Sequence, residues 1–209
     1  VWTVQCLGRG APKDCGPDQD FGSPPMLVRA GRTDLLVAGQ KSGNVWALKP
    51  DTGEIVWRTP LVADTTKFGA KIVWGGAADS SRAYFGLGTG GVAAVRLSDG
   101  ARQWFTDLPP KPDRQAHAGD DGAVSVAGGV VFSGGWDGVV RALSASTGKV
   151  LWEFDTARDF ETTNGAAAHG GSMGAAGPIV AGRRLFVPSG YIGVKNGMAG
   201  NVLLMFTAR

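Results

Sequence analysis

A short pattern recurs three times along the chain at nearly constant spacing. Each copy has Thr or Asp, then Gly, three further residues and a tryptophan. The copies end at Trp57, Trp104 and Trp152, which are 47 and 48 residues apart. A repeat of this length is typical of propellers and solenoids, in which each repeat is one supersecondary unit.

The residues around each copy indicate strands rather than helices. In the first unit, residues 35–39 and 43–48 are short runs rich in apolar residues and bounded by Gly, Asp and Ser. Such runs, separated by Gly turns, are typical of β-hairpins, and no run keeps a helical period. The Gly of each copy supplies the positive φ that a hairpin turn requires. We expect the recurrent Trp to fill the space between one radial sheet and the next.

The repeats predict an all-β fold of the propeller type. At about 48 residues per unit, the chain holds roughly four blades. We place them near residues 22–60, 68–108, 118–156 and 172–209, within one partial propeller domain that spans residues 1–209. We read this arrangement as a partial ring, the C-terminal half of a larger propeller. Its two open sheet faces are expected to dock with a complementary half or a second chain, or to self-associate.

Composition excludes several other classes of protein. The chain has 34 Gly among 209 residues without collagen periodicity, which suits a fold rich in tight turns. Its net charge is only +3, and the basic residues are scattered, so we expect no nucleic-acid partner. No apolar run is long enough for a membrane span. Cys6 and Cys15 share one short loop, and the sequence leaves open whether they form a disulfide or two free thiols.

The repeated motif resembles the tryptophan-docking motif of pyrroloquinoline-quinone-type propellers. Four further segments, at residues 16–25, 68–77, 155–160 and 197–204, resemble the C-terminal half of polyvinyl-alcohol-dehydrogenase-like quinoproteins. This resemblance implies an alcohol dehydrogenase fragment that passes hydride to pyrroloquinoline quinone and holds half of an active site. It also implies Ca²⁺ or a lanthanide, a cytochrome c electron acceptor, a small or polymeric alcohol substrate, and a periplasmic or secreted location.

Asp18 and Asp20 are the candidate catalytic and metal-binding residues. Two carboxylates separated by one residue on an extended segment lie on the same face, where a cation or a proton relieves their repulsion. Hard cations such as Ca²⁺ take oxygen ligands of this kind. The resemblance implies that Asp18 takes the alcohol proton and that both residues bind the metal. The choice of base between Asp18 and Asp20 stays open, and the alternative is an acidic surface turn.

Three residues are candidates for cofactor binding. Lys41 precedes a Gly turn, and the resemblance places it beside the quinone carbonyls, where a fixed cation stabilises developing charge. Trp74 and Met198 are expected at the edge of the cofactor. The alternatives are an exposed turn lysine for Lys41, and packing roles for Trp74 and Met198. For Lys71, near Trp74, the alternative is simple exposure to solvent.

The two histidines carry weaker signals. His169 lies among glycines near the end of a long loop, and we favour a hydrogen-bonded loop residue over a proton shuttle. His117 precedes Asp120 and Asp121, a pair that we discount as a cation site because adjacent strand residues face opposite ways. The main rival to the enzyme is a non-catalytic propeller scaffold that binds protein partners in the cell envelope, since similar blades serve both roles.

Overall fold

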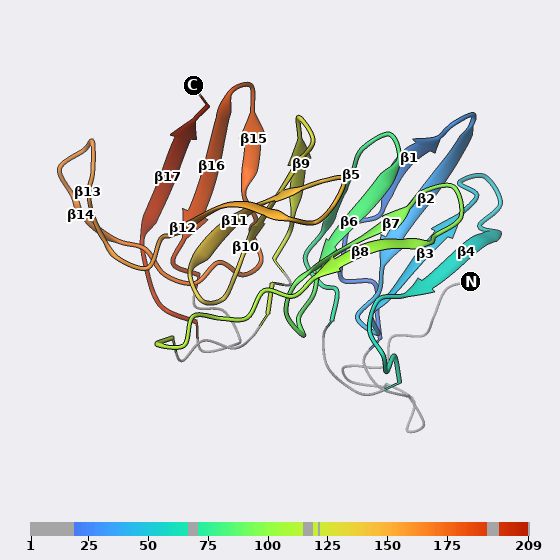
Figure 1. The fold of residues 1–209 in the computed structure, drawn as a ribbon, viewed down its shortest axis with the longest axis horizontal. Helices are drawn as coiled ribbons and strands as arrows, with labels where there is room; N and C mark the ends of the chain where they lie inside the picture. The colour runs from blue at the N-terminus through green and yellow to red at the C-terminus, as the bar shows by residue number, and fades with distance from the viewer. Residues whose placement is uncertain (1–18, 67–70, 115–118, 121, 192–196, 209) are drawn as a thin grey trace, which may run out of the picture.

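The computed structural model describes residues 19–66, 71–114, 119–120, 122–191 and 197–208. Every regular element in these residues is a strand, so the predicted all-β class is confirmed. The strands form successive antiparallel sheets that stand side by side, from the first sheet in blue to the last in red (Figure 1). Each sheet follows the chain order, as expected for a propeller blade.

The first three of these sheets have four strands each. The first runs β1 (Met26–Ala30), β2 (Thr33–Gly39), β3 (Asn44–Leu48) and β4 (Ile55–Pro60). The second runs β5 (Gly76–Ala78), β6 (Arg82–Gly86), β7 (Val92–Arg96) and β8 (Arg102–Thr106). The third runs β9 (Ser125–Ala127), β10 (Val130–Gly134), β11 (Val139–Ser144) and β12 (Val150–Asp155).

The remaining strands depart from this regular plan. A two-stranded hairpin, β13 (Asp159–Glu161) with β14 (Ala167–His169), follows the third sheet where we expected a long loop. Pairing between the two segments explains the difference, because Phe160 lies opposite Ala168 in an antiparallel ladder. The last sheet has three strands among the described residues: β15 (Ile179–Ala181), β16 (Arg184–Ser189) and β17 (Val202–Thr207).

Apolar side chains fill the spaces between adjacent sheets. One buried cluster joins the first two sheets and includes Val37, Val45, Phe85 and Val95. Further clusters join the second sheet to the third and the third to the last. Trp57 is only 8% exposed within the first of these cores. The expected role of the recurrent Trp between sheets is therefore confirmed at this position.

The described residues include no helix that is long and apolar enough to cross a membrane.

Candidate functional site

One edge of the sheets carries the described candidates Asp20, Lys41, Trp74 and Met198. It is formed by the turns between the second and third strands of each sheet and by the connections from one sheet to the next, and we call it the loop face. Backbone hydrogen bonds join turn to connection there: the N–H of Lys71 donates to Lys41, that of Asp120 to Leu87, and that of Met173 to Gly135. The loop face lies along the lower edge of the sheets (Figure 1). These bonds fix the connections against the turns, so side chains from different sheets keep defined positions.

Asp20 and Lys41 meet at the first-sheet end of the loop face. The Lys41 ammonium lies 2.9 Å from a carboxylate oxygen of Asp20. The Lys41 backbone N–H donates to the Asp20 carbonyl at 3.0 Å, so the pair is held by the main chain as well. The Lys41 side chain is 20% exposed and that of Asp20 60%, which leaves the pair accessible to a ligand. Asp18, the other candidate carboxylate, lies outside the described residues, as do Cys6, Cys15 and His117.

Lys71 is a second cation beside this pair. Its residue is only 7% exposed, so the solvent-exposed alternative for Lys71 is wrong. The backbone explains the burial, because the Lys71 N–H donates to Lys41 while its carbonyl accepts from Gly88. Trp74, three residues further on, is half-buried at the start of the second sheet. Within the described part of the chain, Trp74 makes no hydrogen bond, ion pair or ring contact, so its predicted cofactor role stays a prediction.

Met198 lies at the opposite end of the loop face, in the connection between β16 and β17. Its backbone N–H donates to the Ser172 hydroxyl at 2.8 Å, and its sulfur lies 3.7 Å from a guanidinium nitrogen of Arg114. Arg114 in turn pairs with Asp155 at 2.8 Å. Met198 therefore belongs to a polar region of the last two sheets, and Lys41 belongs to the first. No hydrogen bond or ion pair among the described residues joins Met198 to Lys41, and the cofactor role of Met198 also remains a prediction.

Asp155 anchors this polar region. Partial burial disfavours its charged form, but hydrogen bonds from Lys111 and the Ala157 N–H, together with the Arg114 and Lys111 charges, hold the pKa of Asp155 below its usual value. The Lys111 ammonium is 3.0 Å from the same carboxylate oxygen that Arg114 contacts. Asp155 thus stays ionised and ties the connection after the second sheet to the end of β12. Sequence reasoning missed this group because Asp155 is more than 40 residues from both Lys111 and Arg114.

A buried ion network lies inside the third sheet. Arg141 is 4% exposed and pairs with Asp137 at 2.7 Å, with Glu153 at 2.8 Å and with Asp120 at 3.6 Å. Burial works against the charge, but the bond to Asp137 and the surrounding carboxylates raise the pKa of Arg141. Asp120 also accepts from the Gly91 N–H at 2.9 Å. The network gives a role to the Gly-Trp-Asp-Gly turn at residues 135–138. Asp137 on this turn neutralises the charge of Arg141, four residues later.

His169 lies away from these groups, on the β13–β14 hairpin. Its Nδ1 is 2.8 Å from a carboxylate oxygen of Asp159, its cross-strand neighbour, and both side chains are exposed. The hydrogen bond expected for His169 is present, but the residue lies in strand β14 and not in a loop.

The described residues contain no cluster of three or more His, Cys, Asp or Glu that could hold a metal ion. Asp20 is therefore the one predicted metal ligand that the structure describes, and its nearest charged partner is a lysine. The loop face instead offers fixed cations, and such groups bind anionic ligands and stabilise negative charge.

Comparison with known proteins agrees with this fold. Residues 88–207, more than half of the chain, match the PQQ_2 family model, described as outer membrane protein assembly factor BamB. Two polyvinylalcohol dehydrogenases are similar in sequence. The protein from Pseudomonas sp. is 40% identical over 94% of this chain and 34% of its own length. That from Sphingopyxis sp. is 33% identical over 99% of this chain and 38% of its own length.

A solved structure with a similar fold is the quinohemoprotein alcohol dehydrogenase from Comamonas testosteroni. It has a TM-score of 0.54 and 17% identity over 82% of this chain and 30% of that chain. The chain spans about a third of the length of the two curated relatives. Together, the tryptophan repeat, the radial four-stranded sheets and the match over residues 88–207 show that this chain belongs to the PQQ_2 family of quinoprotein-type β-propellers.

Proposed function

We propose that this chain is part of a quinoprotein alcohol dehydrogenase that oxidises a hydroxyl group to a carbonyl. The observation that carries the proposal is the 40% identity to a polyvinylalcohol dehydrogenase over 94% of the chain. The ion pair of Asp20 and Lys41 on the loop face supports it, since both residues were singled out from the sequence and lie together.

The residues of the loop face fit an anionic quinone better than they fit a metal ion. Lys41 is partly exposed and is fixed through its backbone, so its ammonium can contact the carbonyl oxygens of pyrroloquinoline quinone. Lys71, packed beside the same turn, adds a second positive charge. Binding of Ca²⁺ or a lanthanide by Asp18 and Asp20 needs further oxygen ligands, because these cations take six or more. We therefore assign no step of the reaction to the metal.

The quinone, when bound, supplies the acceptor for the hydride that leaves the alcohol carbon with both electrons of the C–H bond. In the proposal, the Asp18 carboxylate takes the hydroxyl proton, with Asp20 as the alternative base. Lys41 holds its ammonium toward the oxygen on which negative charge develops. Electrons then pass to a cytochrome c, the substrate is a small or polymeric alcohol, and the protein acts in the periplasm or outside the cell. A complementary propeller half completes the site.

The test is cofactor binding by protein that contains this chain. We expect pyrroloquinoline quinone to quench tryptophan fluorescence on titration. The variant Lys41→Gln should bind at least tenfold more weakly, since a hydrogen bond from a charged donor contributes about 1.5–3 kcal/mol. Lys49→Gln is the matched control, because Lys49 also pairs with an acidic residue, Glu54, at 2.7 Å. If Lys41→Gln and Lys49→Gln bind the quinone with equal affinity, Lys41 does not contact the cofactor.

A second candidate function is a non-catalytic scaffold for protein–protein contacts in the cell envelope. The description of the matching family as an outer membrane assembly factor favours it. Absorbance spectra and metal analysis of the purified protein separate the two functions. A quinone band with bound metal supports the dehydrogenase, whereas absence of both after reconstitution supports the scaffold.

A further inference from the structure

The turn that carries Lys41, between β2 and β3, contains a chain of side-chain hydrogen bonds. The side-chain oxygen of Gln40 accepts from the Ser42 hydroxyl at 2.8 Å and from the Trp46 indole N–H at 3.1 Å. The Ser42 hydroxyl in turn accepts from the side-chain N–H of Asn44 at 2.9 Å and from its backbone N–H at 3.3 Å. Because an indole N–H can only donate, it fixes which end of the Gln40 amide faces it. We call Gln40, Ser42, Asn44 and Trp46 the turn network.

The turn network is largely buried, and the main chain around it is bonded as well. Ser42 is 1% exposed and Asn44 is 6% exposed. The Gln40 N–H donates to the Asn44 carbonyl at 2.9 Å, and the Gly43 N–H donates to the Gln40 carbonyl at 2.8 Å. Hydrogen bonds are electrostatically stronger in such an environment than in water. The network therefore holds the turn in one conformation.

Lys41 stands between two members of this network, Gln40 and Ser42. Its backbone N–H donates to the Asp20 carbonyl at 3.0 Å, and its carbonyl accepts from the Lys71 N–H at 3.0 Å. The ion pair with Asp20 is a weaker constraint, because the Asp20 side chain is 60% exposed and exposed ion pairs contribute little. The place of the Lys41 ammonium therefore depends on how firmly the turn itself is held.

The corresponding turn of the third sheet is anchored in a related way. The backbone bond from the first turn residue to the fifth recurs there, from the Gly135 N–H to the Val139 carbonyl at 3.0 Å. Counting from this bond places Trp136, which is 1% exposed, at the position of Lys41. The next residue, Asp137, accepts from the Val139 N–H at 3.1 Å. This turn therefore also has a large side chain between anchored neighbours.

The two anchors differ in charge. Arg141 and Trp46 occupy the same place in their sheets, two residues after the end of the turn. Arg141 donates to the Asp137 carboxylate at 2.7 Å, whereas Trp46 donates to the neutral amide of Gln40. The turn network of the first sheet adds no charge next to Lys41, so it leaves the positive charge of the lysine uncancelled.

The second sheet provides a turn without a large side chain. Its first-to-fifth bond runs from the Leu87 N–H to the Gly91 carbonyl at 2.9 Å. Gly88 takes the place of the lysine, and Ala93 takes the place of the indole donor. Among the described residues, this turn has no chain of side-chain hydrogen bonds within itself. Anchoring therefore accompanies the turns that carry a large side chain, which indicates that it serves that side chain.

We propose that the turn network positions the Lys41 ammonium and that Gln40 is its central residue. The inference rests on the proposed contact between Lys41 and the quinone. Gln40 accepts the bonds from both Ser42 and Trp46, so its loss disconnects the network. With the turn fixed in advance, the lysine loses less conformational entropy when an anionic ligand binds. Gln40 is thus a positioning residue that acts through Lys41 and does not itself contact the cofactor.

The first measurement concerns Lys41 itself and is made without quinone. NMR relaxation of the lysine Cε–Hε groups gives side-chain order parameters, and the Lys41 signal is identified by its absence from Lys41→Gln. We expect Gln40→Leu to lower the order parameter of Lys41 and to leave that of Lys49 unchanged. Leucine suits the position, because Leu87 occupies the equivalent place in the second sheet.

The second measurement is a double-mutant cycle on quinone affinity, determined by calorimetry. We expect Gln40→Leu to weaken binding about fivefold, as for residues coupled within one hydrogen-bond network. In the Lys41→Gln background the same change should have no effect, because Gln40 acts through the lysine. Trp46→Phe removes the indole donor but keeps a ring beside Arg58, so it should act in the same direction and less strongly.

Gln103→Leu is the matched control for both measurements. Gln103 is an exposed residue of β8 that donates to the Ala101 carbonyl at 3.1 Å, so its loss should leave Lys41 unchanged. Circular dichroism melts verify that the variants are folded, and Trp46→Phe carries both measurements if Gln40→Leu does not fold.

Two results overturn the proposal. One is an order parameter of Lys41 that is the same in Gln40→Leu as in Gln103→Leu. The other is a loss of affinity from Gln40→Leu that is equal with and without the lysine. Wild-type protein that binds no quinone contradicts the proposed function instead, and the order parameter of Lys41 then decides alone whether the turn network positions the lysine.

Discussion

At the scale of single residues, the loop face depends on carboxylates that stay ionised inside polar clusters. Asp155 accepts from Lys111, Arg114 and the Ala157 N–H, and its side chain is only 28% exposed. Its position at the end of β12 ties this strand to the connection that carries Lys111 and Arg114. The contribution of Asp155 to the free energy of unfolding therefore depends on its charge.

Replacing Asp155 by Asn should lower the free energy of unfolding at pH 7 by about 1–2 kcal/mol, because charge-assisted hydrogen bonds are lost. Interactions with Lys111 and Arg114 lower the folded pKa of Asp155, although partial burial opposes them. Its contribution is thus fully present above the unfolded pKa of about 3.9 and is lost as pH falls through the folded value. Urea unfolding from pH 7 to pH 2 should show the two proteins converging in acid. A gap that stays constant down to pH 2 would contradict this. Asp34→Asn, which removes an exposed pair with Arg29, is the control and should change little.

Gly148 is fixed by both its backbone and its neighbour. It has φ +74°, and an added Cβ would lie 2.5 Å from the Thr106 hydroxyl and 2.7 Å from the Trp104 ring. Gly148→Ala should lower the free energy of unfolding by about 2–4 kcal/mol, from backbone strain and steric overlap together. Gly128→Ala isolates the strain alone, at about 1 kcal/mol, since Gly128 has φ +57° and nothing near its Cβ position. Chemical denaturation of both variants gives the comparison, and equal losses would show that the contact with Trp104 does not matter.

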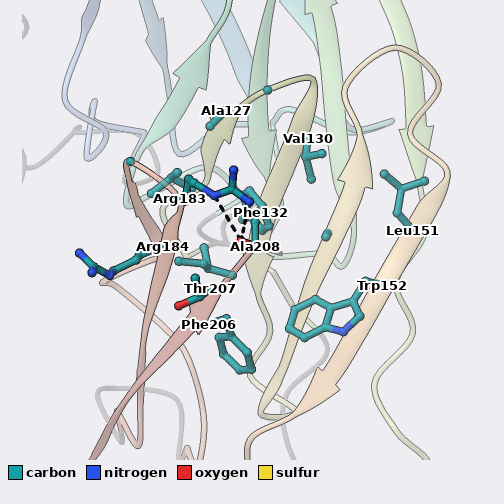
Figure 2. A pocket seen from close by; sticks show the side chains of 15 residues that line it. Ala127, Val130, Phe132, Leu151, Trp152, Arg183, Arg184, Phe206, Thr207 and Ala208 are labelled. Atoms are coloured by element: carbon teal, nitrogen blue, oxygen red, sulfur yellow. Dashed lines mark hydrogen bonds between the residues drawn. The ribbon is translucent and has the colours of Figure 1, made fainter.

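At the scale of elements, the same Trp motif has two different environments. Trp57 is 8% exposed and bonded to the next sheet, whereas Trp152 is 37% exposed between the third sheet and the last (Figure 2). The strands that carry them, β4 and β12, are otherwise alike in position. The difference comes from the neighbouring sheet and not from the motif.

Truncating the two tryptophans should therefore have unequal effects. Trp57→Ala removes a buried ring and leaves a cavity, so we expect a loss of about 3–5 kcal/mol in the free energy of unfolding. Trp152→Ala removes a ring that is partly in water already, so we expect about 1–2 kcal/mol. Thermal melts and urea titrations measure both. A loss at Trp152 equal to that at Trp57 would mean that Trp152 is as well packed in solution as Trp57.

At the scale of the whole molecule, the two end sheets expose apolar rows. On the first sheet, cross-strand pairing aligns Leu27, Leu36, Leu48 and Ile55. On the last sheet it aligns Ile179, Phe186 and Met205, and Leu203 lies beside them. Leu27, Leu203 and Ile179 are each more than 60% exposed. Inner sheets cover the same kind of surface with a neighbouring sheet, whereas no described residue of this chain covers these two rows.

We expect the chain alone to self-associate as its concentration rises, and the double variant Leu203→Lys/Met205→Lys to weaken this association. Burying two lysine charges in the contact costs more free energy than the apolar contact contributes. Sedimentation velocity over a concentration series gives the measurement. The control Thr163→Lys/Ala166→Lys adds the same charge on the exposed β13–β14 hairpin. Equal sedimentation of the two variants would contradict a role for the last sheet.

Much of the architecture could be predicted from the sequence. Trp57, Trp104 and Trp152 mark the outer strand of each four-stranded sheet, and the Gly before each marks the turn, because strand alternation and turn geometry are local properties. The pairing of Asp20 with Lys41 was not predictable from spacing alone. These residues are 21 positions apart, and the main-chain bond between them exists only once the first sheet has formed.

The sequence by itself determined that this chain builds repeated antiparallel sheets, because turn glycines and apolar alternation act within a few residues. Only the tertiary structure decided that Lys71 is buried, that Asp155 holds two cations, and that Trp57 is covered while Trp152 is not. Each of these depends on which surface of a neighbouring sheet lies opposite. Contacts of that kind join residues that are distant in the sequence, 30 positions apart for Lys41 and Lys71 and more than 40 for Lys111 and Asp155, and no local pattern specifies them.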